Sequence, residues 1–202
     1  MISILDYGMG NIGSLINMFM QVGEDVAVIS NKDDVLIADK LVLPGVGSFK
    51  AAMQRINEIP GLRDALDVKA LKHQIPILGV CLGMQLLTES SQEGPADGLG
   101  WISGTTKKFE KIGEMKIPHM GWNEVKVVQK NAFIESINDE SKFYFVHSYF
   151  VEVHDKQNSL LETKHGLRFD SAIIHENILG VQFHPEKSHK HGMKLLESFA
   201  KL

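Results

Sequence analysis

Cys81, the only cysteine among 202 residues, lies in a pattern that could make it a nucleophile. Residues 76–80 form an apolar run of strand length, residues 84–87 have helical character, and Gly79 and Gly83 flank the cysteine. Small residues at those two positions permit a tight strand-to-helix turn that lifts a nucleophile clear of a sheet. The start of a helix also stabilises a thiolate, the reactive form of cysteine. We predict a nucleophilic thiol; the alternative is a cysteine buried as a small apolar side chain.

A cysteine nucleophile needs a base, and the base needs a group that fixes its orientation. His184 and Glu186 are two residues apart and are joined by Pro185. On an extended backbone their side chains point to the same side, and proline stiffens the link. We therefore predict a triad of Cys81, His184 and Glu186. The alternative is that the His-Pro-Glu pair is a solvated part of the surface.

The third requirement is a set of N–H groups that stabilises negative charge on the attacked carbonyl oxygen. The backbone N–H of Leu82, at the predicted helix start, could supply one donor. A glycine-rich turn at another strand-to-helix junction contains Val46 and Gly47 and could supply a second. Each such donor is typically worth about 10²–10³ in rate. The alternative for the turn is an ordinary connection between a strand and a helix.

The elements that must position these residues alternate between strand and helix in the first half of the chain, which predicts an α/β fold. Expected strands are residues 2–5, 26–29, 40–43 and 76–80. Expected helices are residues 12–22, a segment capped by Ser48 that runs to about 56, and residues 62–72.

The second half of the chain is richer in strand signals. Expected strands there are residues 105–109, 124–128, 143–153, 171–175 and 178–183, followed by an amphipathic helix at about 192–201. Residues 90–100 are polar and rich in Gly and Pro, which predicts a surface loop. We expect one domain, residues 1–202, with a mostly parallel central sheet, an antiparallel extension in the same sheet and helices on both faces.

Composition and charge exclude several classes of protein. The net charge of −4 and the pI near 6.1 give no sign of a basic face for nucleic acid. No apolar run approaches the roughly 18 residues of a membrane helix. One cysteine cannot form an internal disulfide, and an acid at position 6 precedes any signal-peptide core. We expect a cytoplasmic protein without membrane contact.

Two further patterns suggest ligand sites. Residues 8–13 read Gly-Met-Gly-Asn-Ile-Gly, a literal dinucleotide-binding pattern, but Asp6 would place a carboxylate near the pyrophosphate, so a tight turn is favoured. His189 and His191 follow His184 and Glu186 and could together suggest zinc. They lack a cysteine and a regular ligand spacing, so a solvated surface is favoured.

Two histidines outside the predicted triad, His119 and His147, have bulky aromatic neighbours in the sequence. Either could be a core histidine whose hydrogen bonds are satisfied. His147 is a poor second choice for the base, because it lacks the carboxylate two residues away that His184 has.

Several motifs resemble the triad-type (class I) glutamine amidotransferases. They are Pro-Gly-Val-Gly (44–47), Gly-Val-Cys-Leu-Gly-Met-Gln (79–85), Pro-His-Met-Gly-Trp-Asn (118–123), Phe-Val-His-Ser-Tyr (145–149) and Phe-His-Pro-Glu-Lys-Ser (183–188). Within that family they are most similar to the glutaminase subunits of imidazole glycerol phosphate synthases. The segments 6–11 and 98–100 fit the same branch, so the resemblance spans nearly the whole chain.

The resemblance implies hydrolysis of the side-chain amide of L-glutamine to L-glutamate and ammonia. Cys81 would attack the amide carbon, His184 would protonate the departing ammonia, and Glu186 would hold His184 in place. Residues expected to line the glutamine pocket are Gly47, Gln85, Ser148 and Tyr149, the last two through their backbones. No cofactor and no metal are implied.

The resemblance also implies a partner, a (β/α)₈-barrel synthase subunit that uses the ammonia to make imidazole glycerol phosphate and an aminoimidazole carboxamide ribotide in histidine biosynthesis. Residues at positions that face this partner are Asn11, Met120, Trp122 and Lys187. The sequence departs from the histidine-pathway pattern at Lys164 and His165, where that branch has threonine and tyrosine. Three alternatives therefore stay open: a paralogous glutaminase feeding another amidating partner, such as a sugar-modifying enzyme, a stand-alone γ-glutamyl hydrolase, and a non-catalytic module.

Overall fold

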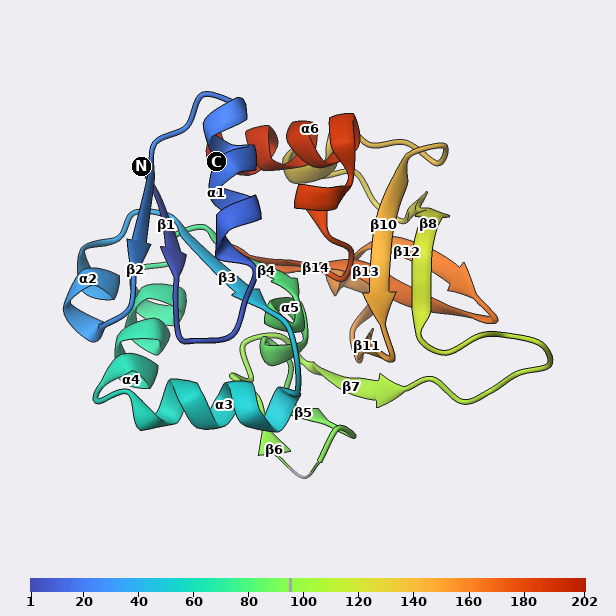
Figure 1. The fold of residues 1–202 in the computed structure, drawn as a ribbon, viewed down its shortest axis with the longest axis horizontal. Coiled ribbons are helices and arrows are strands. Elements are labelled where there is room, and N and C mark those ends of the chain that lie inside the picture. Colours follow the sequence, from blue (N-terminus) through green and yellow to red (C-terminus); the bar gives the residue numbers. More distant parts are fainter. Residues whose placement is uncertain (95) are drawn as a thin grey trace.

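A mixed sheet runs through the molecule, as seen in a computed structural model that describes residues 1–94 and 96–202 (Figure 1). Its parallel part has the strand order β2 (Val26–Ile29), β1 (Ile2–Leu5), β3 (Leu41–Gly45), β4 (Ile77–Cys81) and β14 (Ile178–Val181). Antiparallel strands continue it: β13 (Leu167–His175), β11 (Tyr149–Val153) and β7 (Gly104–Lys108), followed by the short β5 (Ser90–Ser91), which is parallel to β7, and β6 (Ala96–Asp97). In addition, β12 (Ser159–His165) pairs with β13, and β9 (Lys126–Val127) pairs with β12. The predicted α/β class with an antiparallel extension is confirmed.

Side chains of the parallel strands alternate between two apolar cores, one on each face of the sheet. Ile4 and Val42 belong to one core, whereas Leu5 and Leu43 belong to the other. The first core is covered by α1 (Ile12–Gln21) and α6 (His189–Ala200); the second is covered by α2 (Lys32–Ile37), α3 (Phe49–Glu58), α4 (Leu62–Asp67) with the π-helical Val68–Lys72, and α5 (Leu82–Leu86) (Figure 1). Helices on both faces are therefore confirmed.

Two of these helices begin at side-chain caps. Ser48 caps α3, as predicted, by accepting a hydrogen bond from the backbone N–H of Ala51 at 3.4 Å. Asn31 caps α2 by accepting hydrogen bonds from the backbone N–H groups of Asp33 and Asp34, both at 3.0 Å. The sequence analysis did not predict α2, because six residues are too few to show a helical period.

The antiparallel half differs from the expectation of hairpins in one sheet. Residues 143–153, predicted as one strand, are two strands interrupted at Ser148. The first, β10 (Lys142–His147), pairs with β8 (His119–Glu124) in a separate two-stranded sheet, whereas β11 lies in the large sheet. The predicted loop 90–100 contains β5 and β6, and its residue 95 lies outside the described residues. The strands β8 and β12 were also not predicted as such.

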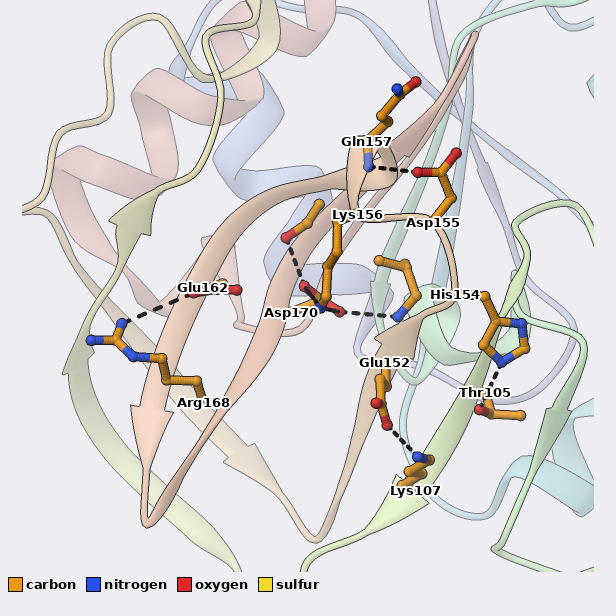
Figure 2. Close-up of polar contacts among 12 residues, drawn as sticks. Thr105, Lys107, Glu152, His154, Asp155, Lys156, Gln157, Glu162, Arg168 and Asp170 are labelled. Carbon is orange, nitrogen blue, oxygen red and sulfur yellow. Dashed lines mark hydrogen bonds and ion pairs between the residues drawn. The ribbon is translucent and has the colours of Figure 1, made fainter.

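A buried carboxylate joins the strands of the antiparallel half. Asp170 of β13 is 1% exposed and accepts hydrogen bonds from the Val153 N–H at 3.0 Å and the Ser159 hydroxyl at 2.6 Å. Its other contact is an ion pair with Lys156 at 3.3 Å (Figure 2). Since a buried charge is tolerated only when it is paired and hydrogen-bonded, this set of contacts fixes β11, β13 and the start of β12 relative to one another.

The helices of the described residues, 1–94 and 96–202, include none that is long and apolar enough to cross a membrane.

Candidate active site

Cys81 ends β4 and immediately precedes α5, in a backbone conformation with φ +56° and ψ −109°. The turn depends on the flanking glycines. A Cβ atom on Gly83 would lie 1.8 Å from the carbonyl oxygen of Leu43, and one on Gly79 would lie 2.6 Å from the carbonyl oxygen of Gly83. Only glycine fits such close backbone approaches, so the predicted strand-to-helix turn is present and holds the thiol at the start of a helix.

His184 reaches the cysteine because β14 pairs in parallel with β4, with Val181 opposite Val80. The Nδ1 atom of His184 lies 2.8 Å from Oε1 of Glu186, and the two side chains are 4% and 3% exposed. A carboxylate can only accept this hydrogen bond, so Nδ1 carries the proton and Nε2 is the ring nitrogen left for chemistry. Nε2 has no hydrogen-bond partner among the described residues, and His184 and Cys81 line the same pocket.

The charge state of His184 is set by its neighbours. Burial alone would lower the pKa of His184, but the contacts with Cys81 and Glu186 outweigh it and raise the pKa to about 10. The imidazole is therefore protonated at neutral pH, between the side chains of Glu186 and Cys81.

The predicted oxyanion turn lies directly beside the nucleophile. Gly45 is in register with Cys81 across β3 and β4, so Val46 and Gly47 come just past the strand end, next to the start of α5. Gly47 has φ +105°, a left-handed conformation that suits glycine. Val46, Gly47 and Leu82 all line the pocket that contains Cys81.

A buried tyrosine supports the strand that carries this turn. The Tyr7 hydroxyl donates a hydrogen bond to the carbonyl oxygen of Pro44 at 2.8 Å. Burial raises the pKa of Tyr7, and the nearby Cys81 raises it further, so Tyr7 remains a neutral donor.

The pocket has a volume of about 410 Å³ and also contains the predicted substrate residues Gln85, Ser148 and Tyr149. The amide nitrogen of Gln85 donates to the backbone carbonyl of Tyr149 at 3.1 Å, which joins α5 to β11. The fold thus brings together the predicted nucleophile, base, oxyanion turn and substrate residues, although they come from segments spread over most of the chain.

The four residues predicted to face a partner are exposed or lie at the pocket rim. Met120 and Trp122 are 63% and 47% exposed on β8. Lys187 lines the pocket, and Asn11 is the exposed N-cap of α1, a helix that contacts the 3₁₀ turn Pro185–Lys187.

Comparison with known proteins identifies the family of the chain. The family described as Glutamine amidotransferase class-I matches residues 3–202. This chain is a class I glutamine amidotransferase. A relative called imidazole glycerol phosphate synthase subunit HisH 2, from Methanococcus maripaludis, is 51% identical over 201 residues, covering 100% of this chain and 99% of that protein. A relative with the same name from Pseudomonas aeruginosa is 44% identical over 202 residues and covers 100% of both chains.

Solved structures support the fold of this amidotransferase. A crystal structure of a glutamine amidotransferase superposes with a TM-score of 0.77 at 14% identity, covering 99% of this chain and 97% of that chain. PurLQS from Thermotoga maritima gives a TM-score of 0.74 at 16% identity, with the same two coverages of 99% and 97%. At such low identity the likeness concerns the fold alone.

In this amidotransferase, residues of the dinucleotide-binding pattern and of the possible zinc site make other contacts. Asp6 accepts a hydrogen bond from the Gly8 N–H at 3.0 Å, which closes a tight turn. His189 stacks on Trp122 with ring centroids 5.3 Å apart, and His191 lies beside Phe143 at 5.9 Å, so neither joins His184. Among residues 1–94 and 96–202, no group of three or more His, Cys, Asp or Glu side chains is arranged to hold a metal ion.

The sequence analysis missed Gln182, which is completely buried beside the triad. Its Oε1 accepts a hydrogen bond from Nε2 of Gln85 at 3.0 Å, and its own Nε2 lies 3.8 Å from Sγ of Cys81. No sequence pattern pointed to Gln182. The extended backbone expected at residues 184–186 is wrong, because Pro185–Lys187 form a 3₁₀ turn, and Glu186 contacts His184 from that turn.

Proposed function

We propose that this chain is the glutaminase subunit of an imidazole glycerol phosphate synthase. It hydrolyses L-glutamine to L-glutamate and ammonia, and residues 1–202 act as one domain. The observation that carries the proposal is the shared pocket of Cys81, His184 and the predicted glutamine contacts, in a chain that is 51% identical to a protein named as such a subunit.

The geometry supports a two-step mechanism. The Cys81 thiolate adds to the amide carbon of glutamine, and the oxygen of the tetrahedral intermediate takes up hydrogen bonds from N–H groups of Leu82 and the turn containing Val46 and Gly47. The C–N bond breaks as His184 gives its Nε2 proton to the departing nitrogen. The nitrogen leaves as ammonia, and the γ-glutamyl group stays on Cys81 as a thioester. His184, now neutral, accepts a proton from the water that hydrolyses the thioester, which regenerates thiolate and imidazolium and releases glutamate.

The ammonia passes to a synthase subunit, a (β/α)₈ barrel that makes imidazole glycerol phosphate and aminoimidazole carboxamide ribotide. Support comes from β8, where the apolar side chains of Met120 and Trp122 face solvent while the polar His119 is buried. A strand with this inverted pattern is suited to being covered by another protein. Asn11 and Lys187 extend the same docking face.

A second candidate is a paralogous glutaminase that supplies a different amidating enzyme. It is favoured by His165, which stands where the histidine-pathway branch has tyrosine. The His165 ring stacks on His119 of β8 with ring centroids 4.1 Å apart, so the departure lies directly behind the proposed docking strand.

The test is to purify the chain with its native partner, identify that partner by mass spectrometry and assay glutamine hydrolysis with and without it. We expect a synthase that binds phosphorylated imidazole-pathway intermediates, stimulation of glutamine hydrolysis by that synthase, and complete loss of turnover in Cys81→Ala. A different amidating enzyme in the complex would support the second candidate. Turnover of γ-glutamyl peptides by the isolated chain would support a stand-alone hydrolase, and retained glutamine turnover in Cys81→Ala would exclude the triad.

A further inference from the structure

We propose that His147 and Gln182 are positioning residues of the glutamine pocket. They hold Gln85 from two sides so that its side-chain oxygen, and not its amide nitrogen, faces the substrate. The inference rests on the proposed glutaminase function and deepens it, because it names what fixes the recognition of glutamine.

The orientation of the Gln85 amide follows from its hydrogen bonds. Its Nε2 donates to the carbonyl oxygen of Tyr149 at 3.1 Å and to Oε1 of Gln182 at 3.0 Å. A backbone carbonyl can only accept, so the atom facing Tyr149 must be the nitrogen, and both of its N–H donors are used. The Oε1 atom of Gln85 makes no hydrogen bond to the described residues, and Gln85 lines the pocket. It is therefore an acceptor for an N–H group of glutamine, either the amide or the α-ammonium.

His147 holds the Tyr149 carbonyl in place. Its Nδ1 donates to that oxygen at 2.7 Å, and its Nε2 lies 2.8 Å from Nδ1 of His119. Burial lowers the pKa of His147 to about 3 and outweighs the backbone hydrogen bond to Tyr149, which raises it. The ring is therefore neutral, and its Nε2 accepts a hydrogen bond from His119. The Nε2 atom of His119 in turn accepts from the amide nitrogen of Asn123 at 3.1 Å. In both rings the proton is therefore on Nδ1 and the acceptor is Nε2, so the tautomers of His147 and His119 are fixed.

Two observations support this assignment for the histidine pair. His119 and His147 are directly opposite each other across β8 and β10, so the strand pairing itself sets their separation. The Asn123 amide nitrogen also donates to the Lys164 carbonyl at 3.0 Å, while its oxygen accepts from the Glu124 N–H at 2.8 Å, so its orientation is fixed as well.

Gln182 holds Gln85 from the opposite side and links it to the nucleophile. Because its Oε1 accepts from Gln85, its Nε2 is the atom that faces Sγ of Cys81 at 3.8 Å. One side chain therefore touches both the residue that would bind the substrate and the atom that would attack it. If the Tyr149 carbonyl or Gln182 no longer holds it, the Gln85 amide can rotate. Its N–H group then faces an N–H group of the substrate, and the lost hydrogen bond weakens binding.

The experiment compares variants of His147 in the complex with the synthase. His147→Phe keeps the ring but removes the donor to Tyr149. His147→Asn and His147→Gln are a matched pair of amides, of which only asparagine places an N–H near the position of Nδ1. The readouts are kcat and KM for glutamine, and the rates at which a glutamine-like diazoketone and iodoacetamide label Cys81. The diazoketone needs the formed pocket, whereas iodoacetamide needs only the reactive thiol.

We expect His147→Phe and His147→Gln to raise KM and slow diazoketone labelling by about tenfold, the effect of one buried hydrogen bond, with kcat and iodoacetamide labelling within about twofold of wild type. His147→Asn should recover most of the loss. Gln182→Met should raise KM similarly and also slow iodoacetamide labelling, because it removes the donor that faces the sulfur. His154→Phe is the control and should match wild type, since His154 does not line the pocket and its ring contacts Thr105 (Figure 2) and Ser103 instead.

Three outcomes would overturn the inference. Wild-type KM and diazoketone labelling in both His147→Phe and Gln182→Met would show that Gln85 needs neither support, while wild-type turnover would leave the proposed function intact. An equal loss of kcat and of both labelling rates, without a change of KM and without rescue by His147→Asn, would indicate a general structural role. A wild-type complex that neither hydrolyses glutamine nor reacts with the diazoketone would remove the proposed function, and this inference with it.

Discussion

In the proposed mechanism His184 donates a proton when ammonia leaves, and its surroundings favour the protonated form of the ring. Glu186 accepts from its Nδ1 at 2.8 Å, and both side chains are almost completely buried. Although burial disfavours the charged ring, the contacts with Cys81 and Glu186 raise its pKa to about 10. The proposed catalytic acid is thus charged across the whole neutral range, and that charge depends on both Cys81 and Glu186.

Replacing Glu186 by glutamine tests this dependence. The carboxylate favours the imidazolium, so Glu186→Gln should lower the pKa of His184 and bring the loss of activity at high pH closer to neutrality. We expect kcat of the complex to fall by about 10² or more, with little change in KM, because the orientation and charge of the acid are lost while the glutamine pocket is untouched. The measurement is the pH profile of kcat and kcat/KM. Glu197→Gln, on the exposed face of α6, is the matched control, and an unchanged alkaline limb in Glu186→Gln would contradict the role of Glu186.

At the residue scale, the sequence singled out the three residues of the proposed triad but not Gln182, which lies beside them. Cys81, His184 and Glu186 belong to short motifs whose spacing is itself the signal. Gln182 contacts Cys81, which is 101 residues away in the sequence, and His147 contacts His119, which is 28 residues away on β8. The donor and acceptor roles in these contacts depend on which atoms meet in the fold, and no sequence pattern contains that information.

The strand-to-helix turn between β4 and α5 is the element on which the site depends. Its backbone passes so close to β3 that a Cβ atom on Gly83 would lie 1.8 Å from the Leu43 carbonyl oxygen. Neither strand can move away easily, because both are central in the sheet and buried on both faces. The position of the thiol therefore depends on the absence of a side chain at residue 83.

Gly83→Ala should destabilise the protein by at least about 3 kcal/mol and disorder the nucleophile, because a methyl group there cannot be accommodated without moving a buried strand. Gly13→Ala is the matched control. A Cβ on Gly13 in α1 would meet nothing within 4 Å, so that variant should gain about 0.5–1 kcal/mol from the better helix propensity of alanine. Chemical denaturation measures both values. Equal stabilities of the two variants would show that the close approach at Gly83 is relaxed in solution.

Element prediction succeeded where a strand is almost entirely apolar and failed where it is not. The strands β1, in which Ser3 is the one polar residue, and β2 match the predicted ranges because such runs are typical of a parallel sheet. In β12 the register shifts beside Leu161, so Leu160 and Leu161 are both buried and no alternation is visible. In β8 the alternation is inverted, with Met120 and Trp122 exposed and the polar His119 buried, so the pattern does not read as a strand that covers a core.

Over the whole molecule, the exposed apolar residues gather at different ends of the sheet, with different consequences. The strand β8 lies at the end of the molecule that holds the antiparallel strands, and α2 lies at the opposite end beside β2 (Figure 1). Trp122 is 47% exposed on β8, and Ile37 is 79% exposed at the end of α2. Under the proposed function the β8 end is covered by the synthase and the α2 end is not, because Met120 and Trp122 lie on β8 and Pro118, just before β8, lines the pocket.

Trp122→Glu should therefore weaken binding of the synthase at least about thirtyfold, since a large aromatic residue at the centre of an interface typically contributes 2 kcal/mol or more and a carboxylate there is desolvated. The melting temperature of the free chain should change by only about 2 °C, because the side chain is half exposed. Ile37→Glu makes the same kind of change at the opposite end and should leave binding unchanged. Calorimetric titration of each variant with the synthase measures both affinities. If Ile37→Glu weakened binding as much as Trp122→Glu, the docking face would have to be placed at the α2 end, and ammonia from Cys81 would then have to pass β3, β1 and β2 to reach its acceptor.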